Sequence, residues 1–250
     1  MFAEPSHLVR PLTRLTAVLA LLGTLVLTGC QAIVSTAPEA QVRIIHATPD
    51  APGLDIYQGS NALAYNLGFG TVTSYIPLAP GIYSIHADTA GSRQTLSTAK
   101  ATFAPSTQYT ILIGNSIASP QQFTLVDQNQ PAPSGQIALR FFNQATRTSA
   151  VDIYLVPAGQ RLTAVSPLVT GVALGASTGY LNIPANTYSL IMEPAGTVPP
   201  SPAAALYAGP QVAYAAGSAR TIVLIDQPLV TTPALQVINA SDFDPSAALN

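Results

Sequence analysis

The segment Val42-Arg43-Ile44-Ile45-His46 decides the fold, because its pattern returns 97 residues later as Leu139-Arg140-Phe141-Phe142-Asn143. The same spacing separates Asp55-Ile56-Tyr57 from Asp152-Ile153-Tyr154. Two later blocks are also matched, those that begin at Tyr75 and Thr110 in the first copy and at Tyr180 and Thr221 in the second. The spacing grows only between blocks, so insertions fall in loops of the second copy. The chain is therefore predicted to contain two copies of one domain.

Each copy consists of short segments rich in Val, Ile, Tyr, Phe and Thr, and a turn signal follows about every ten residues. Pro52-Gly53, Gly59-Ser60 and Pro80-Gly81 are such signals, because proline fixes φ and glycine supplies positive φ. This spacing indicates antiparallel strands. We expect an all-β protein with two tandem immunoglobulin-like β-sandwich domains after an N-terminal signal helix. A single larger barrel is the alternative, and the proline-rich stretch between the two copies argues against it.

The domain organisation follows from these blocks and from composition. Residues 1–29 are predicted to be a lipoprotein signal peptide, and residues 30–40 a flexible tether. The first β-sandwich repeat is placed at 41–127 and the second at 136–245. Residues 128–135 are polar and proline-rich, which is typical of a linker.

The N-terminus carries Arg10 and Arg14, followed by an uncharged apolar run over 15–27. This run is shorter than the roughly 20 residues that a membrane-spanning helix needs. It ends in Leu27-Thr28-Gly29-Cys30, which resembles the bacterial lipobox. The resemblance implies cleavage between Gly29 and Cys30, attachment of a diacylglyceryl group to the Cys30 thiol, and acylation of the new amino terminus, with palmitate or a similar chain. An ordinary secretory signal or a buried N-terminal helix, with Cys30 incidental, is the alternative.

Composition narrows the classes of partner. Cys30 is the sole cysteine, so no disulfide forms within the chain. Only 8% of residues are charged and the net charge is −2, which argues against nucleic acid as a partner. We expect no cofactor. The expected location is the cell envelope, with the chain anchored to the membrane by lipid on Cys30 and facing the periplasm or the exterior.

Residues 42–57 resemble the opening of the bacterial envelope family known as domain of unknown function 4397. Leu78-Ala79-Pro80-Gly81-Ile82-Tyr83 fits the tyrosine-bearing hairpin of that family. The second copy departs from the pattern, with Asn143 in place of the histidine and Thr146-Arg147-Thr148-Ser149 in place of the Pro-Asp-Ala-Pro loop. The resemblance implies an extracellular, sandwich-like fold and no established activity.

His46, Asp50 and Asp55 are predicted to gather at one strand end and the loop after it, where they could bind a ligand. Three or four converging nitrogen or oxygen ligands would be needed for a metal. If the strand alternates regularly, His46 shares the core face with Val42 and Ile44, and a hydrogen-bonded histidine at the rim of the core is the favoured interpretation. We therefore predict no metal site.

Arg43 with Asp55, and Arg140 with Asp152, are polar pairs present in both copies. We interpret them as structural pairs, joined across strands by an ion pair or a hydrogen bond. Asp242 and Asp244 near the C-terminus are expected to be solvated. The proline-rich loop over 193–202 is the expected contact for a partner, because loops on a rigid sandwich are natural recognition surfaces.

These observations favour a non-enzymatic envelope protein with a structural, adhesion or binding role. Its expected partners are membrane lipid, through the acylated Cys30, and an envelope protein or glycan. The alternative is an envelope hydrolase or metal-binding module that uses His46 with Asp50 or Asp55. No catalytic residue is assigned, because Gly175-Ala176-Ser177-Thr178-Gly179 resembles a nucleophile elbow only in spacing and is followed by a predicted strand.

Overall fold

The computed structural model describes residues 38–197, 200–227 and 235–246. The predicted signal peptide and most of the predicted tether, including Gly29 and Cys30, lie outside these residues. The part of the chain from residue 37 onward forms one compact unit. Within the described ranges, no helix is long and apolar enough to cross a membrane.

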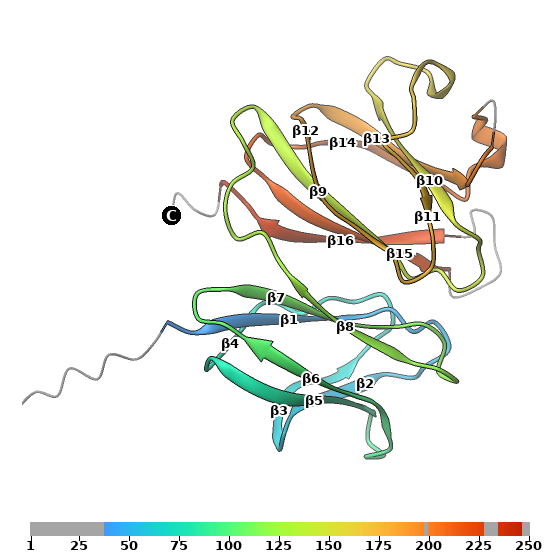
Figure 1. Ribbon diagram of the computed structural model, residues 1–250. Coiled ribbons are helices and arrows are strands. Elements are labelled where there is room, and N and C mark those ends of the chain that lie inside the picture. The colour runs from blue at the N-terminus through green and yellow to red at the C-terminus, as the bar shows by residue number, and fades with distance from the viewer. Residues whose placement is uncertain (1–37, 198–199, 228–234, 247–250) are drawn as a thin grey trace, which may run out of the picture. The chain divides into compact units, whose positions relative to one another are not determined.

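The first copy forms two four-stranded sheets. One sheet has the order β4 (Ile76–Leu78), β1 (Ala40–His46), β7 (Gln108–Gly114) and β8 (Gln121–Val126). The other has the order β3 (Asn61–Leu67), β2 (Leu54–Gln58), β5 (Gly81–Thr89) and β6 (Thr95–Phe103). All pairings are antiparallel except that of β1 with β7, which is parallel and runs from Gln41 opposite Gln108 to His46 opposite Ile113 (Figure 1).

The second copy repeats this topology strand for strand. One sheet has the order β12 (Ser177–Pro184), β9 (Gln136–Asn143), β15 (Ala219–Asp226) and β16 (Leu235–Phe243). The other has the order β11 (Val169–Val172), β10 (Val151–Pro157), β13 (Thr187–Pro194) and β14 (Tyr207–Ala213). Here β9 and β15 form the parallel pair. Two short 3₁₀ turns, Leu162–Ala164 and Pro202–Ala204, lie in loops of this copy.

Each pair of sheets encloses its own core. Val42, Ile44 and Ile56 are fully buried members of the first core, and Ile153 and Met192 are fully buried members of the second. These residues alternate along their strands with residues of the opposite face, which is the pattern that places one face of a sheet inside a sandwich. The prediction of an all-β fold built from β-sandwiches is therefore confirmed, and the alternative of a single barrel is wrong.

A third apolar cluster joins the two copies. Ile45 of β1 and Leu112 of β7 share it with Phe142 of β9 and Val223 of β15. The rings of Phe123 and Phe142 meet edge to face, with centroids 4.9 Å apart. The sheets that contain β1 and β9 are thus covered on both faces, which explains the nearly unbroken burial along β7, β9 and β15. The predicted boundary at 128–135 stays a prediction, because the two sandwiches form one compact unit.

Candidate functional site

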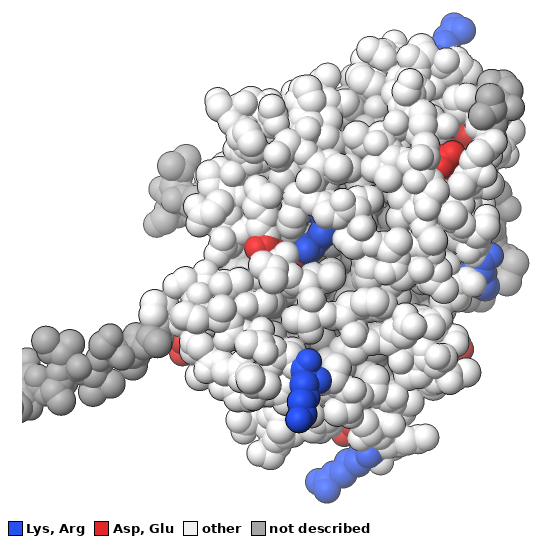
Figure 2. All heavy atoms as spheres, in the orientation of Figure 1, with Lys and Arg blue, Asp and Glu red and all other residues white. Residues whose placement is uncertain are grey.

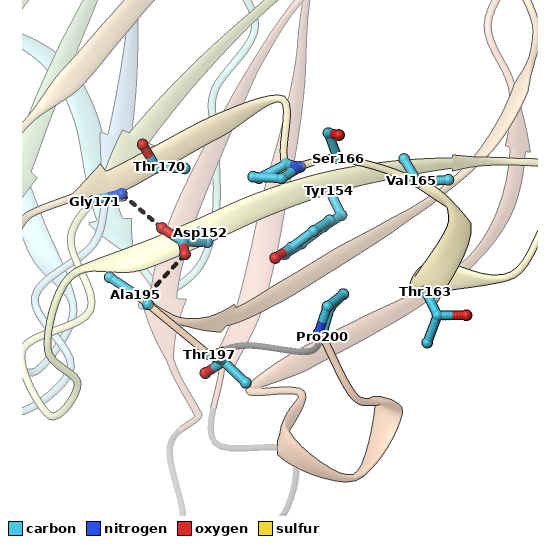
Figure 3. A pocket seen from close by; sticks show the side chains of 12 residues that line it. Asp152, Tyr154, Thr163, Val165, Ser166, Thr170, Gly171, Ala195, Thr197 and Pro200 are labelled. Carbon is cyan, nitrogen blue, oxygen red and sulfur yellow. Dashed lines mark hydrogen bonds between the residues drawn. The ribbon is translucent and has the colours of Figure 1, made fainter.

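The outer sheet of the second sandwich carries a pocket (Figure 3). Asp152 and Tyr154 alternate along β10 with the core residues Val151 and Ile153, so both face away from the core. Loops on either side complete a pocket of about 690 Å³. Its other lining residues are Thr163, Val165, Ser166, Pro167, Thr170, Gly171, Ala195, Gly196, Thr197 and Pro200. The loop expected from the sequence to contact a partner thus lines this pocket.

Asp152 ties strand β11 to the loop that follows β13. Its Oδ1 accepts a hydrogen bond from the backbone N–H of Gly171 and its Oδ2 one from Gly196, both at 2.8 Å (Figure 3). Both glycines have positive φ, 67° and 82°, which a side chain would strain. Because both oxygens are engaged and the residue is only 5% exposed, Asp152 braces the base of the pocket.

Glu193 lies directly across from Asp152 on β13. It is fully buried, and its Oε1 accepts a hydrogen bond from the backbone N–H of Ser201 at 2.8 Å. Its Oε2 has no hydrogen-bond partner among the described residues. Burial raises the pKa of Tyr154, and the negative charges of Glu193 and Asp152 raise it further. The phenol therefore stays protonated and can donate a hydrogen bond to a ligand.

The first sandwich has the same arrangement at the equivalent positions. Asp55 accepts hydrogen bonds from the backbone N–H groups of Asn66 at 2.8 Å and Gly91 at 3.1 Å. Both donors again have positive φ, 46° and 73°. Tyr57 follows on the same face, as Tyr154 does in the second copy. The brace and the tyrosine are therefore features of the repeated fold, and the shared Asp-Ile-Tyr blocks were their signal in the sequence.

A smaller, more polar pocket of about 320 Å³ lies beside Tyr57. The ring of Tyr57 stacks on that of His86, with centroids 5.2 Å apart and planes inclined by 18°. The ring of Tyr65, which is 70% exposed, contacts the Tyr57 ring edge to face, with centroids 6.0 Å apart. Asp88 and Arg93 also line this pocket, with Gly59 and Ser60. Aromatic ring faces therefore stand next to a carboxylate and a guanidinium at the surface.

Asp88 is the counterpart of Glu193, but its surroundings supply more partners. The Thr95 hydroxyl donates a hydrogen bond to its Oδ1 at 2.8 Å, and His86 Nε2 lies 3.9 Å from its Oδ2. The second copy has Ile191 where the first has His86, since each lies directly across from the tyrosine of its sandwich. The two sites thus share a frame and differ in charge.

The predicted grouping of His46 with Asp50 and Asp55 is wrong. His46 is fully buried, its Nδ1 bonds to the carbonyl of Leu67 at 2.9 Å, and burial lowers its pKa. Asp50 instead accepts a hydrogen bond from the backbone N–H of Ile117 at 2.8 Å. Asp55 lies on β2, in the opposing sheet of the sandwich. His46 faces the interior of the protein, so the hydrolase that would use these residues has no assembled site.

The predicted pairs of Arg43 with Asp55 and of Arg140 with Asp152 are also wrong. Arg43 faces away from the core of its own sandwich, whereas Asp55 belongs to the other sheet of that sandwich, on its far side. Arg43 instead reaches the second sandwich, where it pairs with Asp242, and Asp242 is only 5% exposed. The expectation that Asp242 is solvated fails for the same reason.

Arg140 of the second sandwich makes the equivalent contacts with residues of the first sandwich. Its Nη2 donates to Asp127 Oδ1 at 2.5 Å, and its Nη1 donates to the carbonyl of Val126 at 2.8 Å. The guanidinium of Arg140 lies over the ring of Tyr180, with its Cζ 4.6 Å from the ring centroid. Arg43 lies over Tyr75 in the same way, at 4.9 Å. The retained arginines therefore hold the two sandwiches together.

Threonine and tyrosine hydroxyls complete this buried network. Thr110 accepts from Arg43 Nε at 2.8 Å and donates to Asp127 at 2.6 Å. Thr221 stands in the same place in the second sandwich, accepting from Arg140 and donating to Asp242 at 2.8 Å. Burial raises the pKa of Asp242 more than the neighbouring Arg43 lowers it. The network satisfies its own polar atoms, so we assign it a structural role.

Comparison with known proteins finds one match to a family model. Residues 40–154 match the model of the family described as domain of unknown function, DUF4397. The resemblance predicted from the sequence is thus found over these residues. No curated protein matches the chain.

Two solved structures resemble the chain only loosely. One is a family 26 carbohydrate-binding module, CBMbc, of Amy13K from Eubacterium rectale in complex with maltoheptaose. It is 12% identical, with 80% of this chain and 95% of that chain covered and a TM-score of 0.25. The other is a streptococcal virulence factor that binds alpha-glucan, 13% identical, with 62% and 80% covered and a TM-score of 0.23. This likeness carries no argument about a ligand.

Proposed function

We propose that this protein is a lipid-anchored, non-enzymatic component of the cell envelope that binds a glycan through the outer sheets of its two sandwiches. The observation that carries the proposal is the repeated site. In each copy an aspartate, Asp55 or Asp152, bonds to the backbone of the neighbouring edge strand and of a loop, beside an outward tyrosine and a pocket. A frame retained in both copies, with pockets that differ in lining, is suited to display binding groups on a rigid scaffold.

The chemistry of the first pocket favours a glycan. The apolar C–H faces of a sugar ring pack on aromatic rings, and Tyr57, Tyr65 and His86 supply such rings at the surface. Sugar hydroxyls need donors and acceptors in the same place, and Arg93 and Asp88 provide them. The sparse charge of the surface agrees with a neutral polar ligand, since few blue and red atoms are seen on the face in Figure 2.

The anchor rests on the N-terminal sequence. A basic start, a short apolar run and Leu27-Thr28-Gly29-Cys30 support export and acylation of Cys30. Two or three acyl chains are needed for stable attachment, and the lipobox-type signal would supply them on the cysteine and the new amino terminus. The protein would then present its sandwiches on the outer side of the membrane that holds it.

Binding can be tested with purified residues 31–250 on immobilised envelope polysaccharides and on envelope proteins. We expect retention by a polysaccharide and a loss of about tenfold or more in affinity for Tyr57→Ala, equivalent to ~1.4 kcal/mol. Ile82→Ala is the matched control, because Ile82 is 70% exposed on the same face of β5 and does not line the pocket. Retention by protein alone, or equal loss in both variants, would contradict the glycan proposal.

A further inference from the structure

The outer sheet of the second sandwich holds two carboxylates side by side. Asp152 and Glu193 are direct cross-strand partners in the pairing of β10 with β13. Both side chains face away from the core, because Ile153 and Met192 next to them belong to it. Opposed side chains in such a pair have Cβ atoms about 5 Å apart, and like charges at that distance repel. Loops cover the pair, so Asp152 is 5% exposed and Glu193 is fully buried.

No basic side chain compensates these charges within the described residues. The ion pairs found there involve Arg43, Arg140, Arg147 and His86, and none of them reaches Asp152 or Glu193. Three backbone N–H groups bond to the pair, which leaves Oε2 of Glu193 buried without a partner. A buried carboxylate without a counter-charge is costly, so a compensating group is expected at this position.

In the first sandwich the equivalent pair is Asp55 and Asp88, and Asp88 has side-chain neighbours that Glu193 lacks. There Asp88 has the Thr95 hydroxyl and a nearby His86, and Asp55 is only partly buried. In the second sandwich Ile191 replaces the histidine, and Glu193 has a longer side chain under the covering loop. Among the described residues, Glu193 of the second copy thus has no neighbouring polar side chain in the place of Thr95 or His86, and the pair is more deeply buried than Asp55 and Asp88.

We propose that a calcium ion binds between Asp152 and Glu193 and supplies this counter-charge. Calcium takes six to eight oxygen ligands, including carboxylates, carbonyls, hydroxyls and water. No group of three or more acidic, histidine or cysteine side chains that could hold a metal ion is found in the described part of the chain. The remaining ligands would therefore be neutral oxygens, namely solvent water and the hydroxyls of Thr170 and Thr197 in the adjoining pocket, of which that of Thr197 also donates to the carbonyl of Pro194.

Calcium fits this position better than the other common divalent ions. The available donors are oxygens, since neither histidine nor cysteine lines the adjoining pocket, and zinc prefers nitrogen and sulfur. Magnesium demands near-ideal octahedral geometry, whereas calcium accepts irregular sites made of loops. The ion would strengthen the attachment of Gly196 and Ser201 to the sheet through Asp152 and Glu193, and the binding of a glycan is not required for it.

Terbium luminescence provides a direct test. The chain has ten tyrosines and no tryptophan, so excitation of tyrosine beside a bound terbium ion reports the site. With chelator-treated residues 31–250, we expect sensitised emission that calcium displaces with a stoichiometry of one. Tyr154→Phe should dim the emission while calcium still binds in calorimetry. Absence of both terbium emission and calcium binding at ~1 mM calcium would overturn the proposal.

Paired variants separate the site from the equivalent position. Glu193→Gln should abolish calcium binding and the rise of the thermal midpoint with calcium, whereas Asp88→Asn should leave both unchanged. In chelator, Glu193→Gln should unfold at the same or a higher temperature than the parent, because repulsion has been removed. Calcium binding that is retained in the Glu193→Gln variant would rule out this site. Because no glycan is present, the result is independent of the proposed glycan function.

Discussion

Arg43 of the first sandwich and Asp242 of the second form an ion pair buried on both sides, with side chains 3% and 0% exposed. Arg140 and Asp127 form the same pair in the opposite direction. Equivalent residues of the two sandwiches thus pair with one another across one contact, as in the isologous interface of a symmetric dimer. The two sandwiches therefore pack against each other like the subunits of such a dimer, but within a single chain.

Removal of one partner from this network should destabilise the protein strongly. Arg43→Met leaves Asp242 and Asp127 as buried charges with fewer partners, and we expect a loss of about 3–5 kcal/mol in the free energy of unfolding. Urea denaturation followed by circular dichroism measures it. Arg147→Met is the control, because its side chain is 41% exposed and its loss should cost about 1 kcal/mol or less. Equal effects would show that the network contributes little.

Stability should fall as the pH drops below about 6.5, in part because of His46. Burial lowers the pKa of His46 from its usual 6.5, so the unfolded chain takes up a proton that the fold does not. The contribution of neutral His46 is complete above pH 6.5 and is lost as the pH falls below it. His46→Asn, which copies Asn143 of the second sandwich, should flatten this dependence in unfolding measured from pH 7 down to about 5. An unchanged slope would contradict the assignment.

The braces should matter more in the second sandwich than in the first. Asp152→Ala removes the acceptor for two backbone N–H groups, and we expect a cost of about 1–3 kcal/mol together with faster proteolysis near Gly196. Asp55→Ala removes the same bonds at a more exposed position, so its cost should be smaller. Denaturation and limited proteolysis of the two variants test the order, and a larger effect at Asp55 would reverse it.

Acylation of Cys30 should be visible in the native protein. We expect mass spectrometry of the N-terminal peptide to find Cys30 as the first residue, carrying lipid. Cys30→Ser should leave the protein unlabelled by palmitate and release it from membranes after washing. A native peptide that retains residues 1–29 with an unmodified thiol would refute the proposed anchor.

The candidate site was only partly foreseen. The matched Asp-Ile-Tyr blocks pointed to Asp55 and Asp152, but their partners are backbone N–H groups of distant loops, which no pattern in the sequence identifies. The sequence shows Glu193 only as the start of a loop, and its burial with an unpartnered Oε2 is visible only in the fold. The burial of Asp242 is likewise not encoded locally, because its charged partner, Arg43, is contributed by the other sandwich.

The sequence by itself determined the strands, the turns and the duplication, because alternation, turn residues and repeated blocks are local properties that each copy carries in full. Only the tertiary structure decided which arginine meets which aspartate and which carboxylates lie together without a counter-charge. The physical reason is that these contacts join residues of different sheets or different sandwiches. Their distances depend on how whole sheets pack, and sequence spacing does not encode that packing.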